Sequence, residues 1–206
     1  MAILNSQEYL YLSVSKGILR NKKKNIETRG YEGILIGIEE VEDSYEGVPR
    51  MRVNLKMKDP KSKEVAIIQF NEETWFSIGF FSRIQKIDIT KPFTLGVSPS
   101  EKNEKISFCW LKQEGVFNEK KEPKVEADKD FPKPVTTKIG RNEVQDWGKP
   151  IERILTIIDE LKAKLGDSGN LGTGGKPDAL DQSLKSKPLN PFALVANAGP
   201  DDDLPF

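Results

Sequence analysis

The chain has 206 residues, of which 31% are charged and 36% hydrophobic, and its 32 basic and 32 acidic side chains leave no net charge. It contains no histidine and a single cysteine, Cys109. This composition excludes Ser-His-Asp and Cys-His catalysis, HExxH zinc sites, internal disulfides and multi-thiolate metal sites.

The charges are segregated along the chain. Residues 1–30 carry six basic and two acidic side chains, residues 31–47 six acidic and no basic ones, and residues 48–70 six basic and two acidic ones. The N-terminal residues lack the apolar core of a signal peptide, and no apolar run reaches the roughly 20 residues of a membrane span. Together with the single cysteine, this favours a cytoplasmic protein without a membrane partner.

Apolar and polar residues alternate with a period of two in the first half of the chain, as in half-buried strands. A strand is expected at 9–14, whose two faces would be Leu10, Leu12 and Val14, and Tyr9, Tyr11 and Ser13. A second is expected at 31–41, with Ile34, Ile36 and Ile38 on one face. Gly33 and Gly37 permit bends or bulges in it.

The stretch 49–58 has the clearest alternation in the sequence. Its apolar face would hold Met51, Val53, Leu55 and Met57, and its polar face Arg50, Arg52, Asn54, Lys56 and Lys58. Turn residues follow at 59–63, so 64–70 is expected to return as the partner strand of a hairpin.

A short helix is expected at 74–84, with Asn71 as its N-cap and Glu72 and Glu73 in the first turn. Phe76 and Phe80 are predicted to be buried. Residues 91–98 and 105–112 are then expected to form two strands joined by a polar turn. Cys109 in the second of these is interpreted as a small buried side chain.

Counted from Tyr31, the expected order of elements is three strands, a helix and two strands. An OB-fold, a five-stranded Greek-key barrel that often binds oligonucleotides, has this order. We therefore predict a mainly β fold, with an OB-fold-like Greek-key barrel over 1–115 that contains one short helix and an additional N-terminal strand.

The composition changes after this region. Residues 116–145 are charged and proline-bearing, too polar to build a core, and are predicted to be a linker. An amphipathic helix is predicted at 146–166, with Pro150 in its first turn, Gly166 at its end and an apolar stripe of Ile151, Ile154, Leu155, Ile158, Leu161 and Leu165. The stripe suits either packing on the barrel or self-association. Residues 167–200, rich in Gly, Ser, Asn and Pro, are predicted to be a disordered tether to an acidic tip at 201–206.

Basic residues in the first 60 positions suggest a polyanionic partner. The polar face of the strand at 49–58 would place Arg50, Arg52, Lys56 and Lys58 beside a phosphate backbone. An expected loop adds Arg20, Lys22, Lys23 and Lys24. Exposed strand faces are also commonly charged, and lysine protects edge strands from aggregation, so this pattern alone leaves both interpretations open.

Aromatic residues favour binding of single-stranded nucleic acid, which combines a basic groove with rings on which bases stack. Tyr9, Tyr11 and Trp75 are the candidate rings. Arg83, near Trp75 in the sequence, is predicted to bind DNA with them, and Trp110 is interpreted as structural.

Four acidic residues invite a different interpretation, that of a two-metal nuclease. They are Glu39, Glu40, Glu42 and Asp43. Two-metal sites usually draw carboxylates from separate elements, whereas these lie together at one strand end and turn. A solvated loop is therefore favoured, and no metal site is predicted.

The closing residues, "DDDLPF", resemble the acidic tips of the single-stranded DNA-binding proteins of bacteria and their phages, which end in Asp-Asp-Asp-Ile/Leu-Pro-Phe. A β domain followed by a Gly/Pro/Asn-rich tether is similar to the same family. The resemblance implies that the Phe206 ring inserts into a pocket on a partner while its α-carboxylate meets a basic side chain. It also implies that the aspartates contact a cationic rim and that the partners are replication, recombination and repair enzymes. The implied protein-interaction residues are Asp201, Asp202, Asp203, Leu204, Pro205 and Phe206.

The N-terminal region lacks the signature of the ordinary bacterial family, and a helix at 146–166 stands where that family has only a linker. This favours a phage-type protein that acts in the cytoplasm or nucleoid of a bacterial host. We expect it to be no enzyme, to need no cofactor, and to coat and protect single-stranded DNA, with homo-oligomerisation left open. The alternatives are a strand-annealing or recombination mediator that assembles through the helix, and a metal-dependent phage nuclease.

Overall fold

The computed structural model describes residues 9–45, 47–139 and 142–168. Its elements are, in chain order, β1 (Leu10–Ser15), β2 (Ile18–Asn21), β3 (Ile26–Thr28), β4 (Gly30–Tyr45), β5 (Val48–Lys58), β6 (Val65–Asn71), α1 (Trp75–Ile84), β7 (Phe93–Pro99), β8 (Ser107–Lys112), β9 (Val135–Ile139), β10 (Asn142–Asp146) and α2 (Gly148–Ser168). These elements belong to the first of two compact units, Met1–Leu171. The tether from residue 169 and the tip at 201–206 lie outside the described residues.

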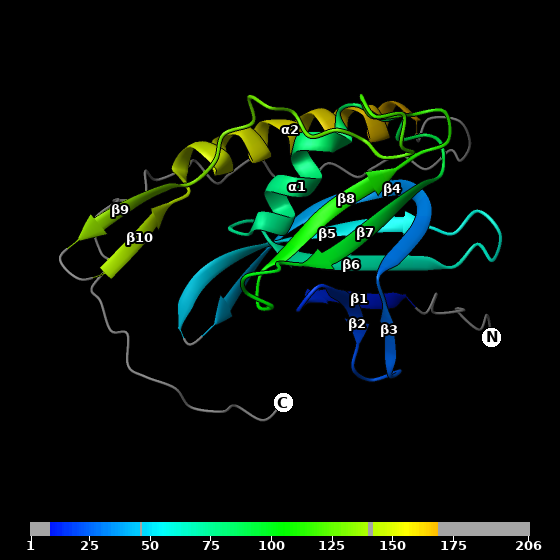
Figure 1. Cartoon of the computed structure of the whole chain (residues 1–206). Coiled ribbons are helices and arrows are strands. Elements are labelled where there is room, and N and C mark those ends of the chain that lie inside the picture. The colour runs from blue at the N-terminus through cyan, green and yellow to red at the C-terminus, as the bar shows by residue number, and fades with distance from the viewer. Residues whose placement is uncertain (1–8, 46, 140–141, 169–206) are drawn as a thin grey trace, which may run out of the picture. The chain divides into compact units, whose positions relative to one another are not determined.

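Eight strands form one curled, half-barrel sheet in the order β3-β2-β1-β6-β5-β4-β7-β8 (Figure 1). Neighbouring strands are antiparallel except β1 and β6, which run parallel. The long strand β4 joins the two halves of the sheet, because residues 30–33 pair with β7 and residues 34–45 pair with β5. The prediction of a mainly β protein is confirmed.

The strands predicted from alternation are β1, β4, β5, β6, β7 and β8. In β5 the predicted apolar face is the buried one, since Val53, Leu55 and Met57 are fully buried. Lys58 on the predicted polar face is exposed. The predicted hairpin is also present, since β5 pairs antiparallel with β6.

One face assignment in β4 is wrong. The register with β5 shifts between Leu35 and Gly37, so that Leu35 and Ile38 are buried and Ile36 is 44% exposed. A bulge inserts one unpaired residue and reverses which face the following side chains occupy. Ile36 and Ile38 therefore do not share a face, although the flexibility expected at Gly37 is used for this bulge.

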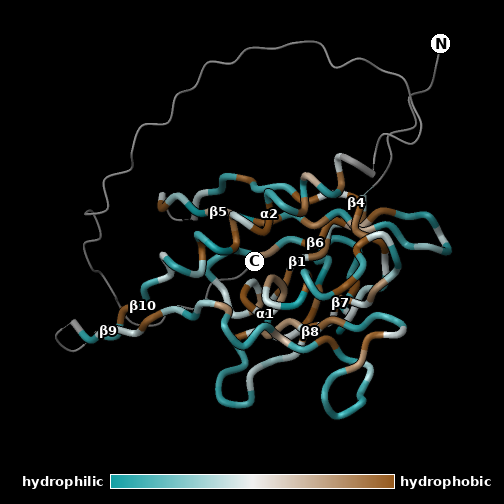
Figure 2. Tube along the Cα trace, turned by 90° about the horizontal axis from the view of Figure 1, so that it is seen from above, coloured by the Kyte–Doolittle hydropathy of each residue, from teal (hydrophilic) through white to brown (hydrophobic). Residues whose placement is uncertain are grey.

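The core lies between the sheet and α1, where the most apolar segments gather in Figure 2. Phe76 and Phe80 are buried as predicted. The predicted N-cap at Asn71 is wrong: Asn71 still pairs with β5, and Thr74 caps α1 by accepting a hydrogen bond from the backbone N–H of Ser77 at 3.1 Å. Glu72, expected in the first turn of the helix, instead directly follows β6, where its backbone N–H donates to the Met51 carbonyl at 3.3 Å and its side chain is buried.

Two hairpins were not predicted. β2 and β3 flank the lysine-rich turn at 22–25, in a stretch expected to be a loop. β9 and β10 form a separate two-stranded sheet inside the predicted linker. Both hairpins have sequence signals, since Leu19 and Ile26 flank the lysine-rich turn and β9 is rich in β-branched residues. The high charge of these stretches had predicted a loop and a linker instead.

The predicted linker also contributes to the core. Val125 and Phe131 are nearly fully buried, and the Val125 backbone N–H donates to the carbonyl of Leu111 in β8 at 2.9 Å. The expectation that 116–145 is too polar for this is wrong for these two side chains, because a few well-spaced apolar residues can anchor an otherwise polar segment.

The predicted amphipathic helix is α2, which contacts β4 and α1 (Figure 1). Of the predicted apolar stripe, Ile154, Ile158 and Leu161 are buried. The assignment of Leu155 to this face is wrong, since Leu155 is 37% exposed and Ile157 is buried instead. Gly166 does not end the helix, which continues to Ser168. None of the helices in the described part of the chain has the length and apolar character of a membrane span.

Candidate nucleic-acid interface

A groove of about 640 Å³ opens where segments far apart in the sequence meet. It is lined by the end of β1 and the turn after it, Arg52 of β5, the end of β6, the start of α1, the start of β8, and Gln145 and Trp147 before α2. The segments span more than 130 positions of sequence between Ser13 and Trp147. The groove is therefore a product of the tertiary fold.

The turn after β1 contacts β8, the last strand of the sheet, beside this groove. The backbone N–H of Gly17 donates to Ser107 Oγ at 2.9 Å. Gly17 has φ +74°, and a Cβ atom there would lie 2.4 Å from the backbone nitrogen of Pro99. Only glycine combines this conformation with this close approach, so Gly17 positions β1 beside the start of β8.

Three aromatic rings form a partly exposed cluster at the groove. Trp75 opens α1, and its ring centroid lies 6.4 Å from that of Phe108 in β8 and 6.1 Å from that of Trp147. Phe108 is 40% exposed, and both tryptophans are partly exposed. Flat rings with accessible faces beside a groove are suited to stacking on nucleobases.

The side chains around the groove carry more positive than negative charge. Lys16, Arg52 and Lys105 line it, against the single carboxylate of Glu73. Arg52 also pairs with Asp43, with 2.6 Å between Nη2 and Oδ2. A cleft with excess positive charge attracts phosphate groups.

The groove continues onto the outer face of β1, β6 and β5. Strand register places Tyr11 beside Ile67 and Ile67 beside Lys56, and places Ser13 beside Gln69 and Gln69 beside Asn54. Neighbouring strands are about 4.8 Å apart, so Tyr11 and Lys56 are separated by about 10 Å. The parallel pairing of β1 with β6 thus brings a predicted stacking ring and a predicted basic strand onto one surface.

Other predicted residues surround this surface. Tyr9 and Tyr11 are 37% and 49% exposed, and Arg20 shares the row of Ser13 while it pairs with Glu27 at 3.0 Å. Arg50 and Lys58 occupy the two ends of β5, and both are exposed. The lysines of the turn between β2 and β3 are exposed and belong to the same hairpin as Arg20; they are Lys22, Lys23 and Lys24.

Arg83 is not at the groove. It lies in the last turn of α1, where Nε donates to the carbonyl of Val125 at 3.1 Å and Nη1 to that of Gly79 at 2.7 Å. Burial lowers the pKa of its guanidinium. Its contacts tie α1 to the 116–131 segment, so Arg83 has a structural role.

The four acidic residues expected in a solvated loop lie in strand β4. Glu39 forms an ion pair with Lys56 and Asp43 one with Arg52, on the outer face. Glu40 points to the other face, where Oε2 accepts from Lys162 of α2 at 2.7 Å. Strand alternation separates these carboxylates, and the described residues contain no cluster that could hold a metal ion.

Cys109 is buried, as predicted, and burial raises the pKa of its thiol well above the usual range. A thiol held protonated in the core is a poor nucleophile.

Sequence reasoning missed Trp147, Lys16, Lys105 and Phe108. Each is an isolated residue in its own stretch, and only the aromatic character of Trp147 and Phe108 could have marked them.

Comparison of this chain with protein-family models, with curated proteins and with solved structures finds no match. The functional interpretation therefore depends on the site itself.

Proposed function

We propose that the protein binds single-stranded DNA along the surface that runs from Tyr11 over β6 and β5 into the groove at Trp75. The observation that carries this proposal is the partly exposed cluster of Trp75, Trp147 and Phe108 beside a groove lined by Lys16 and Lys105. Rings accept bases of any sequence, and cations follow the phosphate backbone.

The topology supports an OB-like interpretation. From β4 onward the order is strand, strand, strand, helix, strand, strand, and the long β4 pairs with both β5 and β7. OB-folds bind oligonucleotides on the face of their second and third strands and on the adjoining loops. β5 and β6 would be those strands here. The described sheet differs in one respect, since β1 occupies the edge of β6 on which an OB barrel closes.

A single-stranded ligand fits this surface better than duplex DNA does. Half-buried rings that lie between strand ends can stack on unpaired bases, whereas the bases of a duplex already stack on one another.

The alternative of assembly through α2 receives less support, because the apolar stripe of α2 is already buried against β4 and α1. The two-metal nuclease alternative has no shared carboxylate site in the described residues.

Fluorescence anisotropy with labelled oligo-dT tests the proposal. Affinity should fall steeply with salt. A plot of log affinity against log salt concentration should have a slope of about −3 if four phosphates are contacted, because each contacted phosphate contributes about −0.7 to the slope.

Trp75→Ala should weaken binding about fivefold or more, since one stacked base contributes about 1–3 kcal/mol. Lys16→Gln with Lys105→Gln, both exposed side chains, should make the slope shallower by about 1.4.

Phe117→Ala is the matched control, because this 61% exposed ring lies outside the groove lining. It should leave the affinity for oligo-dT unchanged. Binding that ignores salt, or that prefers duplex DNA, would refute the proposal. Cleavage of the oligonucleotide with magnesium, or faster annealing of complementary strands, would favour one of the two alternatives.

A further inference from the structure

The outer face of β8 continues from the aromatic cluster of the groove. Phe108, Trp110 and Lys112 alternate with the buried Cys109 and Leu111, so they share this face. Same-face neighbours on a strand are about 6.8 Å apart, twice the rise per residue, which is the scale of one extended nucleotide. Because Phe108 contacts Trp75, the row begins at the groove.

The ring of Trp110 lies flat on the neighbouring strand. Trp110 is opposite Gly96 in the β7–β8 register, and a Cβ atom at Gly96 would lie 2.0 Å from ring atoms Cε2 and Cζ2. Glycine thus supplies the space for the ring. Trp110 is partly exposed, and the Nζ atom of Lys112 lies 5.1 Å from its ring centroid.

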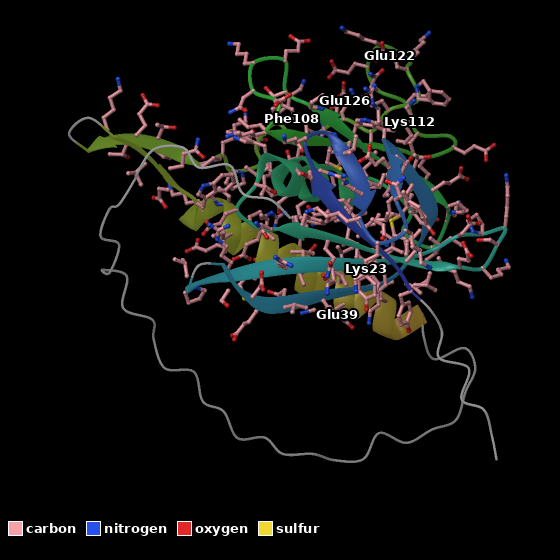
Figure 3. All side chains as sticks on the ribbon, turned by 90° about the horizontal axis from the view of Figure 1, so that it is seen from below. Lys23, Glu39, Phe108, Lys112, Glu122 and Glu126 are labelled. Carbon is pink, nitrogen blue, oxygen red and sulfur yellow. The ribbon has the colours of Figure 1, made fainter. Side chains whose placement is uncertain are left out.

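A shallow pocket of about 300 Å³ adjoins this ring. It is lined by Trp110, Lys112, Glu122, Pro123 and Lys124. The segment 122–125 is held against β8 by the hydrogen bond from the Val125 N–H to the Leu111 carbonyl. Glu122 is engaged by Asn118, which donates to its Oε2 at 2.8 Å. Phe108, Lys112 and Glu122 lie in one part of the molecule in Figure 3, away from Lys23 and Glu39.

We infer that this pocket is a second nucleotide subsite, reached by the same DNA strand after it leaves the groove along β8. A base would stack on Trp110 in place of the Lys112 ammonium, since stacking gains more free energy than an exposed cation–π contact. The displaced Lys112, together with Lys124, would then contact the phosphates. The inference deepens the proposed function and rests on it.

Tryptophan fluorescence can report on the groove and the subsite separately, because the chain has three tryptophans. Trp110→Phe leaves only Trp75 and Trp147, which report on the groove. The double variant Trp75→Phe/Trp147→Phe leaves only Trp110 and retains flat rings in the groove. An oligo-dT of about four nucleotides should quench only the groove reporters, whereas one of about sixteen should also quench Trp110.

The outcomes separate the two claims. We expect both oligonucleotides to quench the groove reporters and only the longer one to quench Trp110. Quenching of the groove reporters without any response of Trp110 would overturn the subsite and leave the proposed function standing. No response of any tryptophan, with no binding by anisotropy, would refute both.

Charge substitutions provide the second test. Lys112→Gln/Lys124→Gln should make the salt slope for the longer oligonucleotide shallower by about 1.4 and leave the slope for the shorter one unchanged. Lys133→Gln/Lys138→Gln removes the same charge at two exposed positions that line neither the groove nor the pocket, and it is the matched control. An equal effect of both pairs would mean that only the total charge matters, which would also overturn the subsite.

Discussion

Among single residues, Glu72 is a buried carboxylate whose hydrogen-bonding capacity is only partly used. It is 8% exposed, and its Oε2 has no hydrogen-bond partner among the described residues. Burial raises its pKa above the ordinary value of 4.5, and the negative charges of Glu73 and Glu40 add to this. The ionised form is therefore disfavoured in the folded state, so this group reduces stability at neutral pH.

We predict that Glu72→Gln raises the free energy of unfolding at pH 7 by about 1 kcal/mol, on the scale of an unsatisfied buried polar group. The pKa of Glu72 is higher in the folded chain than in the unfolded chain. The loss of stability that Glu72 causes in the wild type therefore grows as the pH rises from the unfolded-state pKa through the folded-state pKa. The gain should therefore disappear near pH 4. Urea unfolding at both pH values measures this, and Glu73→Gln, its exposed neighbour, should change little. An equal gain in the free energy of unfolding at both pH values would show that ionisation of Glu72 is not the cause.

At the scale of elements, the β4–β5 hairpin pairs an acidic strand with a basic one. Glu39 and Asp43 engage Lys56 and Arg52 on the face proposed to bind DNA. Phosphates must therefore compete with carboxylates of the same protein. Exposed ion pairs are weak, with a median of about 0–1 kcal/mol, so this competition moderates DNA affinity without preventing binding.

We expect Glu39→Gln/Asp43→Asn to tighten oligo-dT binding by up to about tenfold at low salt, with less gain at high salt. Glu40→Gln removes a charge from the same strand on the other face, where the carboxylate pairs with Lys162. It should leave the affinity nearly unchanged. Anisotropy titrations at two salt concentrations compare the three proteins, and weaker binding of the double variant would show that these carboxylates support the DNA site.

At the scale of the whole molecule, the segregated charges suggest two separate interaction regions. Four basic residues lie on β5, near the groove that Lys16 and Lys105 line, whereas the acidic tip at 201–206 lies outside the described residues; the four are Arg50, Arg52, Lys56 and Lys58. An aromatic anchor flanked by acids is suited to a partner's apolar pocket with a cationic rim. We propose that the tip recruits replication, recombination and repair enzymes.

Deletion of residues 201–206 should leave the affinity for oligo-dT unchanged or higher, because three carboxylates that repel phosphate are removed. It should abolish binding to purified recombination and repair enzymes of a bacterial host, measured by surface plasmon resonance on the immobilised variant with the immobilised full chain as reference. Phe206→Ala, which keeps the aspartates, should lose partner binding without the gain in DNA affinity. Retained partner binding by both variants would exclude the tip as the docking segment.

Local patterns were sufficient for most strands and both helices. Alternation in 49–58 and the apolar stripe of 146–166 each describe which face of one element is buried, and that depends on neighbours within the same element. The bulge in β4 and the cap at Thr74 could not be placed in this way. Each depends on how far the pairing with β5 extends, which is a property of two strands.

The mainly β fold, the buried aromatic helix, the basic face of β5 and the candidate rings Tyr11 and Trp75 follow from local residue patterns. The parallel pairing of β1 with β6, the contact of Trp147 and Phe108 with Trp75 and the structural role of Arg83 become visible only in the folded chain. The reason is physical: periodicity records which side chains avoid water, whereas a groove depends on contacts between segments far apart in the chain, such as Gly17 and Ser107.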